Sequence, residues 1–374
     1  MKYAAVFALS SVLLAGTAAF AATDDLTAVY KKGRLTLTPD PDFAPGADWG
    51  ALFFDRTRKI RVAPDGSIFV ASQRDHTISK FDAGGRLLKT FGRHGQGPGD
   101  LESPSELSLL DGRTLVVGGY ISGRKISLFN LDGEFQAVLK TRHPPSRPTA
   151  LGNGKIAYIG VRAGASEFQG NTFVMKNINT VVILDVRTGA EREVTSITTT
   201  LNEPKDGTVM IAPAARGDLL VGLTTRPEIE IYDGSGTKKG VLTLTIDRLP
   251  VTKKITETYQ VKVFTREGGK GMTTAYPLGE FLPYYADMTA DALGNLIVFK
   301  MSEDPKTGPL VIQAYSPAGK LLGETEIDRA GFDIPLNKWI HQQLNFTERG
   351  LFGLFPRQGD ELETPRLFRV RLQP

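Results

Sequence analysis

The stretch Ile60–Leu88, which reads IRVAPDGSIFVASQRDHTISKFDAGGRLL, decides the fold. It contains short runs in which apolar and polar residues alternate, and turn residues around Gly66 and Gly85 separate these runs. Alternation with a period of two between glycine turns is typical of short antiparallel strands. The stretch therefore predicts a unit of four short strands connected by three turns.

The same unit recurs along the chain, and a fixed repeat indicates the architecture better than any single strand does. The glycines of its first turn are Gly66, Gly112, Gly154, Gly217, Gly294 and Gly350. The first two intervals, 46 and 42 residues, fit the roughly 40 to 50 residues of a four-stranded propeller blade. The longer intervals predict insertions near residues 163–177 and 249–286. We expect both to be ordered loops over one face, the second with a helix near 253–266.

A ring of blades needs a complete last sheet, because an unfinished one leaves an exposed strand edge. The sixth unit offers three strands before the chain reaches Pro374, and the isolated segment 34–38 would supply an outer fourth strand. We therefore expect an all-β fold over residues 22–374: a six-bladed β-propeller of four-stranded blades, with the N-terminal strand closing the last blade. A pair of β-sandwiches or a β-helix fits six copies of the unit less well. Aromatic residues at matching strand positions should pack between the blades, namely Phe69, Phe81, Phe129, Tyr158, Tyr232, Phe299 and Tyr315.

Residues 1–21 have the pattern of a cleaved secretory signal peptide. Lys2 precedes the apolar run Ala4–Leu14, and the small residues that follow end in Ala19-Phe20-Ala21, an A-x-A cleavage site. An uncleaved membrane anchor is the alternative, and the polar residues near this run weigh against it. No cysteine follows the run, which excludes a lipoprotein. We expect a periplasmic or secreted protein that has no membrane span after cleavage.

The composition is that of an ordinary globular protein. Hydrophobic residues make up 41% and charged residues 23% of the 374 residues, and cysteine is absent. A chain of this length buries enough surface to be stable without disulfides. Cleavage would remove one lysine and leave 44 basic against 41 acidic residues. This net charge is too small to indicate a nucleic-acid partner.

Part of the first unit resembles a known repeat. The segment Phe91–Leu101, FGRHGQGPGDL, follows Phe81-Asp82 and precedes Pro104. It looks like the NHL repeat, in which a strand ending in Phe-Gly leads into a Gly-x-Gly-Pro-Gly loop before the next inner strand. The signature is specific in the first unit and faint from the third onward. The mature chain, with its Pro283-Tyr284-Tyr285 loop, is similar to exported bacterial six-bladed propellers of NHL type. Relatives with this fold include lactonases, lyases and binding proteins, so the resemblance implies a shape and not a chemistry.

Motifs for phosphate, nucleophile and metal chemistry are absent or incomplete. Pro98 interrupts the glycine run Gly95–Gly99, which leads into a strand and not into the helix that a dinucleotide loop opens, so we interpret the run as a turn. The segment Gly268–Thr273 lacks the Ser or Thr directly after Lys that a P-loop needs. No Gly-x-Ser-x-Gly elbow is present. The four histidines are far apart in sequence, but the ring brings loops together, so a composite site that includes His76 and His94 stays open.

Two classes of function fit this sequence. The first is a binding or interaction module that uses the face of the ring formed by the loops between second and third strands and the loops between blades. The second is a propeller enzyme, a lactonase-like hydrolase or a lyase, that acts on a small molecule with a divalent metal such as calcium or zinc. No other cofactor is expected. The ligand would be a small molecule, glycan or peptide, and a protein partner is also open.

Arginines concentrate on this face of the first three blades and favour an anionic ligand, because guanidinium groups donate to carboxylates and phosphates. Scattered solvated charges are the alternative interpretation. The candidate ligand-binding residues are Arg74, His76, Arg93, His94, Arg124, Arg147, Tyr284 and Tyr285. No catalytic residue or metal ligand can be assigned. Replacing Arg93, Arg124 and Arg147 with Ala is expected to weaken anion binding and to leave folding intact.

Overall fold

The structure is a computed structural model of the chain. It describes residues 30–31, 33–36, 43, 59–119, 123–169, 172–200, 204–259, 262–267, 270–275, 278–329, 336, 340–347, 350–356 and 365–370. The predicted signal peptide, residues 1–21, lies outside the described residues. No helix in the described part is long and apolar enough to cross a membrane.

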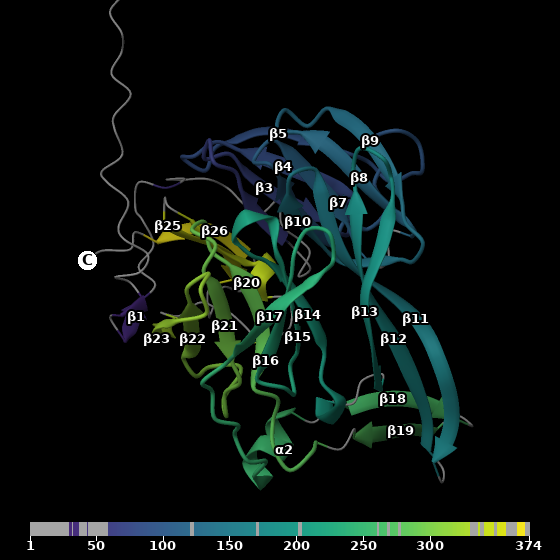
Figure 1. Ribbon diagram of the computed structural model, residues 1–374, viewed down its shortest axis with the longest axis vertical. Coiled ribbons are helices and arrows are strands. Elements are labelled where there is room, and N and C mark those ends of the chain that lie inside the picture. Colours follow the sequence, from purple (N-terminus) through teal and green to yellow (C-terminus); the bar gives the residue numbers. More distant parts are fainter. Residues whose placement is uncertain are drawn as a thin grey trace, which may run out of the picture.

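Five groups of four consecutive antiparallel strands follow one another along the chain and form the blades of a β-propeller (Figure 1). Blade 1 consists of β2 (Lys59–Val62), β3 (Ile68–Ser72), β4 (Thr77–Phe81) and β5 (Leu87–Phe91). Blade 2 consists of β6 (Glu106–Leu110), β7 (Thr114–Gly118), β8 (Lys125–Asn130) and β9 (Phe135–Lys140). Blade 3 consists of β10 (Pro145–Gly152), β11 (Lys155–Gln169), β12 (Thr172–Asp185) and β13 (Glu191–Thr200). Blade 4 consists of β14 (Val209–Pro213), β15 (Leu219–Leu223), β16 (Glu228–Tyr232) and β17 (Lys238–Thr243).

Blade 5 and a shorter sheet complete the ring. Blade 5 consists of β20 (Tyr285–Ala290), β21 (Leu296–Lys300), β22 (Leu310–Tyr315) and β23 (Leu321–Asp328). The last sheet has the three strands β24 (Leu344–Thr347), β25 (Gly350–Pro356) and β26 (Pro365–Val370). Short 3-10 turns are η2 (Pro204–Asp206), η3 (Ala215–Gly217) and η4 (Ile340–Gln342). The first strand of each sheet contacts the first strand of a neighbouring sheet, and β24 contacts β2, so these strands surround the axis of the ring.

Buried apolar side chains fill the space between neighbouring sheets. Phe69 and Phe129 pack between blades 1 and 2, and Tyr158 packs between blades 2 and 3. Phe299 packs between blade 5 and the last sheet, and Phe352 packs between the last sheet and blade 1. All seven aromatic residues predicted to pack between blades are buried in such clusters. This prediction is confirmed.

The prediction of six four-stranded blades is wrong for the described residues, which form five such blades and a three-stranded sheet. The predicted closure of the ring is not confirmed either. β1 (Arg34–Thr36) pairs in parallel with β23, the outer strand of blade 5, and not with the last sheet (Figure 1). Tyr30 explains this position. Its hydroxyl donates to Asp291 and its carbonyl accepts from the Thr325 hydroxyl, so the segment before β1 is anchored on blade 5.

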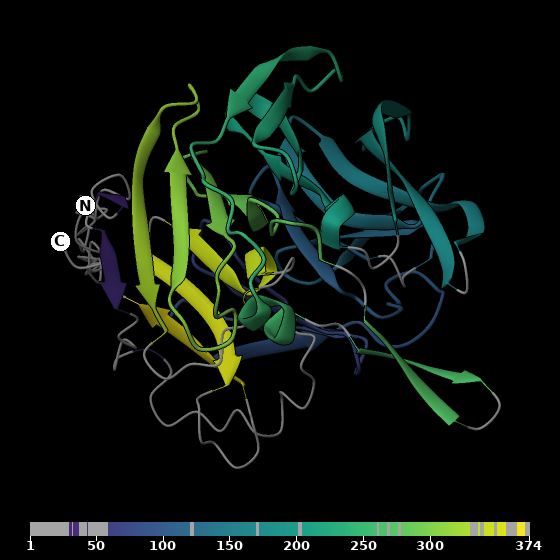
Figure 2. The ribbon, with the colours of Figure 1, turned by 90° about the horizontal axis from the view of Figure 1, so that it is seen from below.

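Both predicted insertions contain strands, which corrects the expectation of loops. Residues 163–169 and 172–177 are the outer end of the β11–β12 hairpin, in which Gln169 lies opposite Thr172. In the second insertion α2 (Lys253–Tyr259) covers only the first half of the predicted helix. The strands β18 (Lys262–Glu267) and β19 (Lys270–Ala275) follow it as a hairpin that extends away from the ring (Figure 2). The β-branched and aromatic residues of β18 favour a strand over a helix.

The antiparallel order of the strands gives the ring two faces. Loops between second and third strands and loops between blades lie on one of them, which we call the loop face. Turns between first and second strands and between third and fourth strands lie on the other, which we call the hairpin face. Each first strand therefore begins near the loop face and ends near the hairpin face.

Candidate functional site

The structure brings two of the predicted ligand-binding residues together on the loop face. The ring centroids of His76 and His94 are 4.3 Å apart. The Nδ1 atom of His76 accepts a hydrogen bond of 2.9 Å from the backbone N–H of Ser103. A neutral His76 therefore carries its proton on Nε2, and this tautomer does not present the Nε2 lone pair that a metal ion would need.

Arg93 is engaged in an ion pair on the same face. Its Nε atom donates to Asp100 at 2.8 Å, and this contact holds the pKa of Asp100 below its usual value. The Asp100 carboxylate also accepts the N–H of Gly97, and a Cβ at Gly95 would overlap it. The glycine run is thus a tight turn built around Asp100, as its sequence indicated.

Three more predicted residues lie on the loop face. Arg74, in the turn before β4, and Arg124, just before β8, are exposed. Tyr284 is half-buried, and the guanidinium carbon of Arg248 lies 5.4 Å from the centre of its ring. No contact between described residues joins Arg124 or Tyr284 to the histidine pair.

Arg147 and Tyr285 are buried, with exposed fractions of 5% and 0%, and Tyr285 packs in the apolar cluster between blades 4 and 5. The Nη2 atom of Arg147 donates to Asp287 at 2.9 Å and to the Met288 carbonyl at 3.2 Å. The Tyr285 hydroxyl lies against Gly222, and it makes no hydrogen bond with a described residue. The sequence had predicted both as ligand-binding residues of the loop face. Arg147 instead ties blade 3 to blade 5.

Sequence reasoning missed a group of buried charged side chains around Arg147, which we call the axial cluster. It consists of Lys59, Glu106, Arg147, Asp287 and His341. His341 lies with its Nδ1 atom 2.6 Å from Asp287 Oδ2 and its Nε2 atom 3.9 Å from Glu106 Oε2. Because an ionised carboxylate only accepts, Nδ1 carries the proton and donates it to Asp287. The backbone N–H of His341 donates to the same oxygen at 3.0 Å.

Burial sets the protonation of the axial cluster. It lowers the pKa of Lys59 and raises the pKa of Glu106, because both lose the solvation of their charged forms. Burial, helped by the positive charge of Arg147, lowers the pKa of His341 to about 3. Burial also opposes ionisation of Asp287, but Arg147 and His341 outweigh it and the pKa of Asp287 falls below its usual value. His341 is therefore neutral and Asp287 charged at neutral pH.

Polar side chains at the axis connect the first strands of neighbouring sheets. Arg61 of β2 donates to the Leu107 carbonyl of β6, and Ser108 of β6 accepts from the Ala150 N–H of β10. Asn345 of β24 bonds the backbone of β2 at Ile60 and Val62. These contacts and those of the axial cluster satisfy backbone groups that face the channel. We interpret the axial cluster as a structural connection between blades, since none of its members lines the cavity described next.

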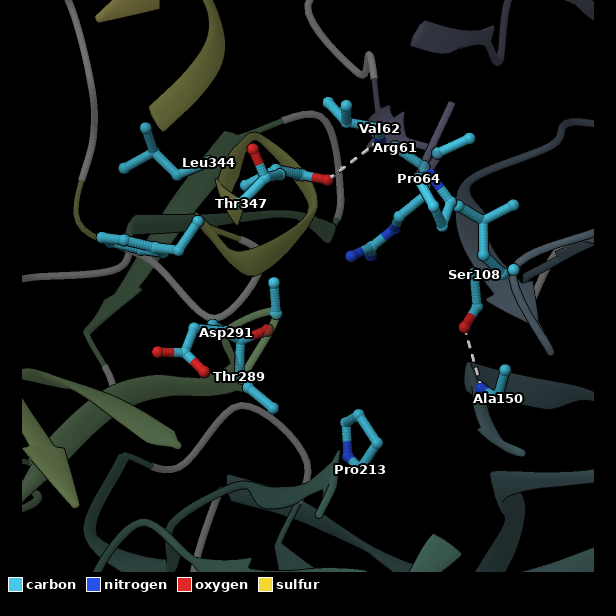
Figure 3. Close-up of a pocket in the computed structure, with 17 residues that line it drawn as sticks. Arg61, Val62, Pro64, Ser108, Ala150, Pro213, Thr289, Asp291, Leu344 and Thr347 are labelled. Atoms are coloured by element: carbon cyan, nitrogen blue, oxygen red, sulfur yellow. Dashed lines mark hydrogen bonds between the residues drawn. The ribbon is translucent and has the colours of Figure 1, made fainter. Parts of the chain in front are cut away.

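A cavity of about 410 Å³ lies on the axis at the hairpin face, and we call it the axial cavity. The ends of the first strands supply its wall, as the side chains around the open centre of Figure 3 show. Its apolar lining includes Val62, Pro64, Leu109, Pro213, Leu344 and Phe346, and its polar lining includes Arg61, Ser108, Thr289, Asp291, Asn345 and Thr347. Figure 3 shows the guanidinium group of Arg61 pointing into the centre. The cavity therefore combines apolar surface with polar groups, among them one cation, Arg61, and one carboxylate, Asp291.

The carboxylate of Asp291 is held by its own turn and by Tyr30. Its two oxygens accept the N–H groups of Leu293 and Asn295, the side-chain amide of Asn295 and the Tyr30 hydroxyl. No cluster of three or more His, Asp or Glu side chains in the described part of the chain is arranged to hold a metal ion. The alternative of a metal-dependent enzyme stays a prediction.

A signal for the axial residues was present in the sequence. The segment Lys59–Val62 reads KIRV, so its two charged residues alternate with two apolar ones in a strand that the repeat places at the axis. Glu106 stands likewise at the start of the first strand of blade 2. Charged residues in the innermost strands of a ring need partners across the axis. His341, in η4, carries no such signal.

Comparisons with known proteins concern the fold. No family model and no curated protein matches the sequence, so the NHL resemblance stays a prediction. Among solved structures, the chain is similar to a member of the DUF4221 family from Bacteroides vulgatus, with 12% identity, 89% of this chain and 94% of that chain covered and a TM-score of 0.49. It is also similar to an exported protein from Bacteroides fragilis (12%, 87% and 92%, 0.45) and to a gluconolactonase from Xanthomonas campestris (11%, 85% and 88%, 0.45).

Proposed function

We propose that this protein is an exported binding protein that takes a small molecule into the axial cavity, at the hairpin face of its propeller. The observation that carries the proposal is the cavity itself, whose volume of about 410 Å³ falls within the roughly 300 to 1,000 Å³ of small-molecule sites. Its lining combines apolar side chains with convergent polar groups, as small-molecule sites do. Export rests on the signal-peptide pattern of residues 1–21.

We favour the hairpin face over the loop face because two of the arginines predicted to bind a ligand on the loop face are already engaged in ion pairs. Arg93 is paired with Asp100, and Arg147 is buried against Asp287. Binding of a glycan, peptide or protein partner by the exposed loop-face residues stays a prediction. A small molecule in the axial cavity needs no rearrangement of these ion pairs.

The test is a ligand-observed NMR screen of a fragment library against the wild type and two variants. Ala290→Phe places a ring on the wall of the axial cavity, where Ala290 is half-buried. Ala190→Phe adds the same bulk at an exposed turn that does not line the cavity. We expect fragments that bind the wild type and Ala190→Phe and lose binding to Ala290→Phe. Fragments that bind all three proteins equally, or a library without binders, would contradict the proposal.

A further inference from the structure

Arg61 presents an unused set of N–H donors to the axial cavity. Its Nε and Nη2 atoms both donate to the Leu107 carbonyl, at 3.2 and 2.9 Å. A guanidinium group has five N–H bonds in a fixed plane, so this contact uses one edge and orients the rest. The second Nη2 hydrogen and the two Nη1 hydrogens remain, and Nη1 makes no hydrogen bond with any described residue.

The charge of Arg61 has no close counterion within the described part of the chain. Arg61 forms no ion pair there. Burial lowers its pKa to about 10, and only the more distant charge of Glu106 opposes this effect, so the side chain stays protonated at neutral pH. A half-buried cation without a partner is costly, and an anion that enters the cavity would remove this cost.

The other polar groups of the cavity restrict the chemistry of the rest of the ligand. The Ser108 Oγ atom accepts the Ala150 N–H at 2.8 Å, and its own O–H donates to no described residue. Asp291 has its oxygens occupied by four donors. Thr289, Asn345 and Thr347 add polar groups to the wall, and the other lining residues are apolar or glycine. The cavity thus offers the free donors of Arg61 together with apolar surface.

We propose that the axial cavity binds a small molecule with a carboxylate group and an apolar body, and that the free Nη1 and Nη2 hydrogens of Arg61 hold the carboxylate as a pair of parallel hydrogen bonds. This inference rests on the proposed function and names the class of its ligand. A planar carboxylate matches the edge of a guanidinium group. The second charge of a phosphate monoester would face Asp291 across the same cavity, so we expect phosphates to bind more weakly.

The test compares probes of equal shape and different charge. Isothermal titration measures benzoate against benzamide, cyclohexanecarboxylate against cyclohexanecarboxamide, and phenyl phosphate. Charge-assisted hydrogen bonds contribute about 1.5–3 kcal/mol, so each carboxylate should bind the wild type at least about tenfold more tightly than its amide. Arg61→Gln should remove this preference, and Arg61→Lys, which keeps the charge and loses the planar edge, should reduce it.

Arg113→Gln is the matched control. Arg113 is exposed in the turn after β6, at the same face, and does not line the cavity. The Arg113→Gln variant should keep the preference for carboxylates. This result would show that the preference depends on the contact with Arg61 and not on the positive charge of the hairpin face in general. If the Arg61 variants do not fold, the ratio of carboxylate to amide affinity in the wild type still tests whether the cavity prefers carboxylates.

The outcomes distinguish this inference from the proposed function. Equal binding of carboxylates and amides, both lost in Ala290→Phe, would overturn the carboxylate proposal and leave the axial cavity as the binding site. Carboxylate binding that survives Ala290→Phe would overturn both. Tighter binding of phenyl phosphate than of benzoate would assign the site to phosphates and contradict the class proposed here.

Discussion

Replacing Arg147 with Ala should destabilise the fold strongly, although the sequence alone places this residue among exposed ligand-binding arginines. Arg147 is 5% exposed and its partner Asp287 is 0% exposed, and their contact is 2.9 Å. Removing one partner of a buried ion pair costs about 3–5 kcal/mol, because the other charge is left buried. Asp287 keeps donors from His341 and from the Met288 N–H. We therefore expect a loss near the lower end, about 3 kcal/mol.

Urea unfolding followed by circular dichroism measures this loss. Arg124→Ala is the control, because Arg124 is exposed and its replacement should change the free energy of unfolding by less than about 0.5 kcal/mol. Adding Asp287→Asn to Arg147→Ala removes the stranded charge, so the double variant should lose less than the sum of the two single losses. A loss below about 1 kcal/mol for Arg147→Ala, or strict additivity in the double variant, would refute the view that this pair connects the blades.

Three further predictions concern the same structure. Because the pKa of His341 is about 3 in the folded protein and 6.5 in the unfolded chain, the unfolded state binds more protons between these values. Stability should therefore fall by up to about 1.4 kcal/mol per pH unit below pH 6.5, and urea titrations of His341→Gln should show a shallower fall. Gly222→Ala would place a Cβ against the Tyr285 hydroxyl and should lower the free energy of unfolding by about 1–3 kcal/mol. Gly240→Ala, whose Cβ meets nothing within 4 Å, should cause no such loss. Equal unfolding midpoints of the two variants would contradict this prediction. Mass spectrometry of the protein from a periplasmic extract should show cleavage after Ala21, and a retained Met1 would contradict export.

The blades could be predicted from the sequence because each of their strands is short, local and bounded by turn residues. Gly66 and Gly85 mark two turns of blade 1, and both adopt a positive φ, of 90° and 83°, which favours glycine. Ring closure depends instead on contacts between distant segments. Arg34 pairs with Glu326 in β23, and no local pattern in residues 34–38 distinguishes the outer edge of blade 5 from that of the last sheet.

The site was harder to predict than the fold, because side chains at the axis contact residues of sheets that are far apart in the sequence. Arg147 and Asp287 are 140 residues apart and meet at 2.9 Å. The sequence predicted Arg147 as a ligand-binding residue of the loop face and started the first strand of the fifth unit after Asp287, whereas the structure places both residues in first strands. Conversely, Arg93 has the features of a ligand-binding arginine in the sequence, while its partner Asp100 lies in the same turn.

The same first strands explain why a ligand of the proposed kind would enter from the hairpin face. At their beginnings, near the loop face, long charged residues such as Lys59 and Glu106 meet at the axis and are buried there. At their ends the side chains that face the axis are often small or rigid, as at Ala150, Pro213 and Ala290. Long side chains fill one half of the channel, and short ones leave the other half open. Arg61 lies between the two halves, bound to the Leu107 carbonyl by one edge and facing the cavity with the other.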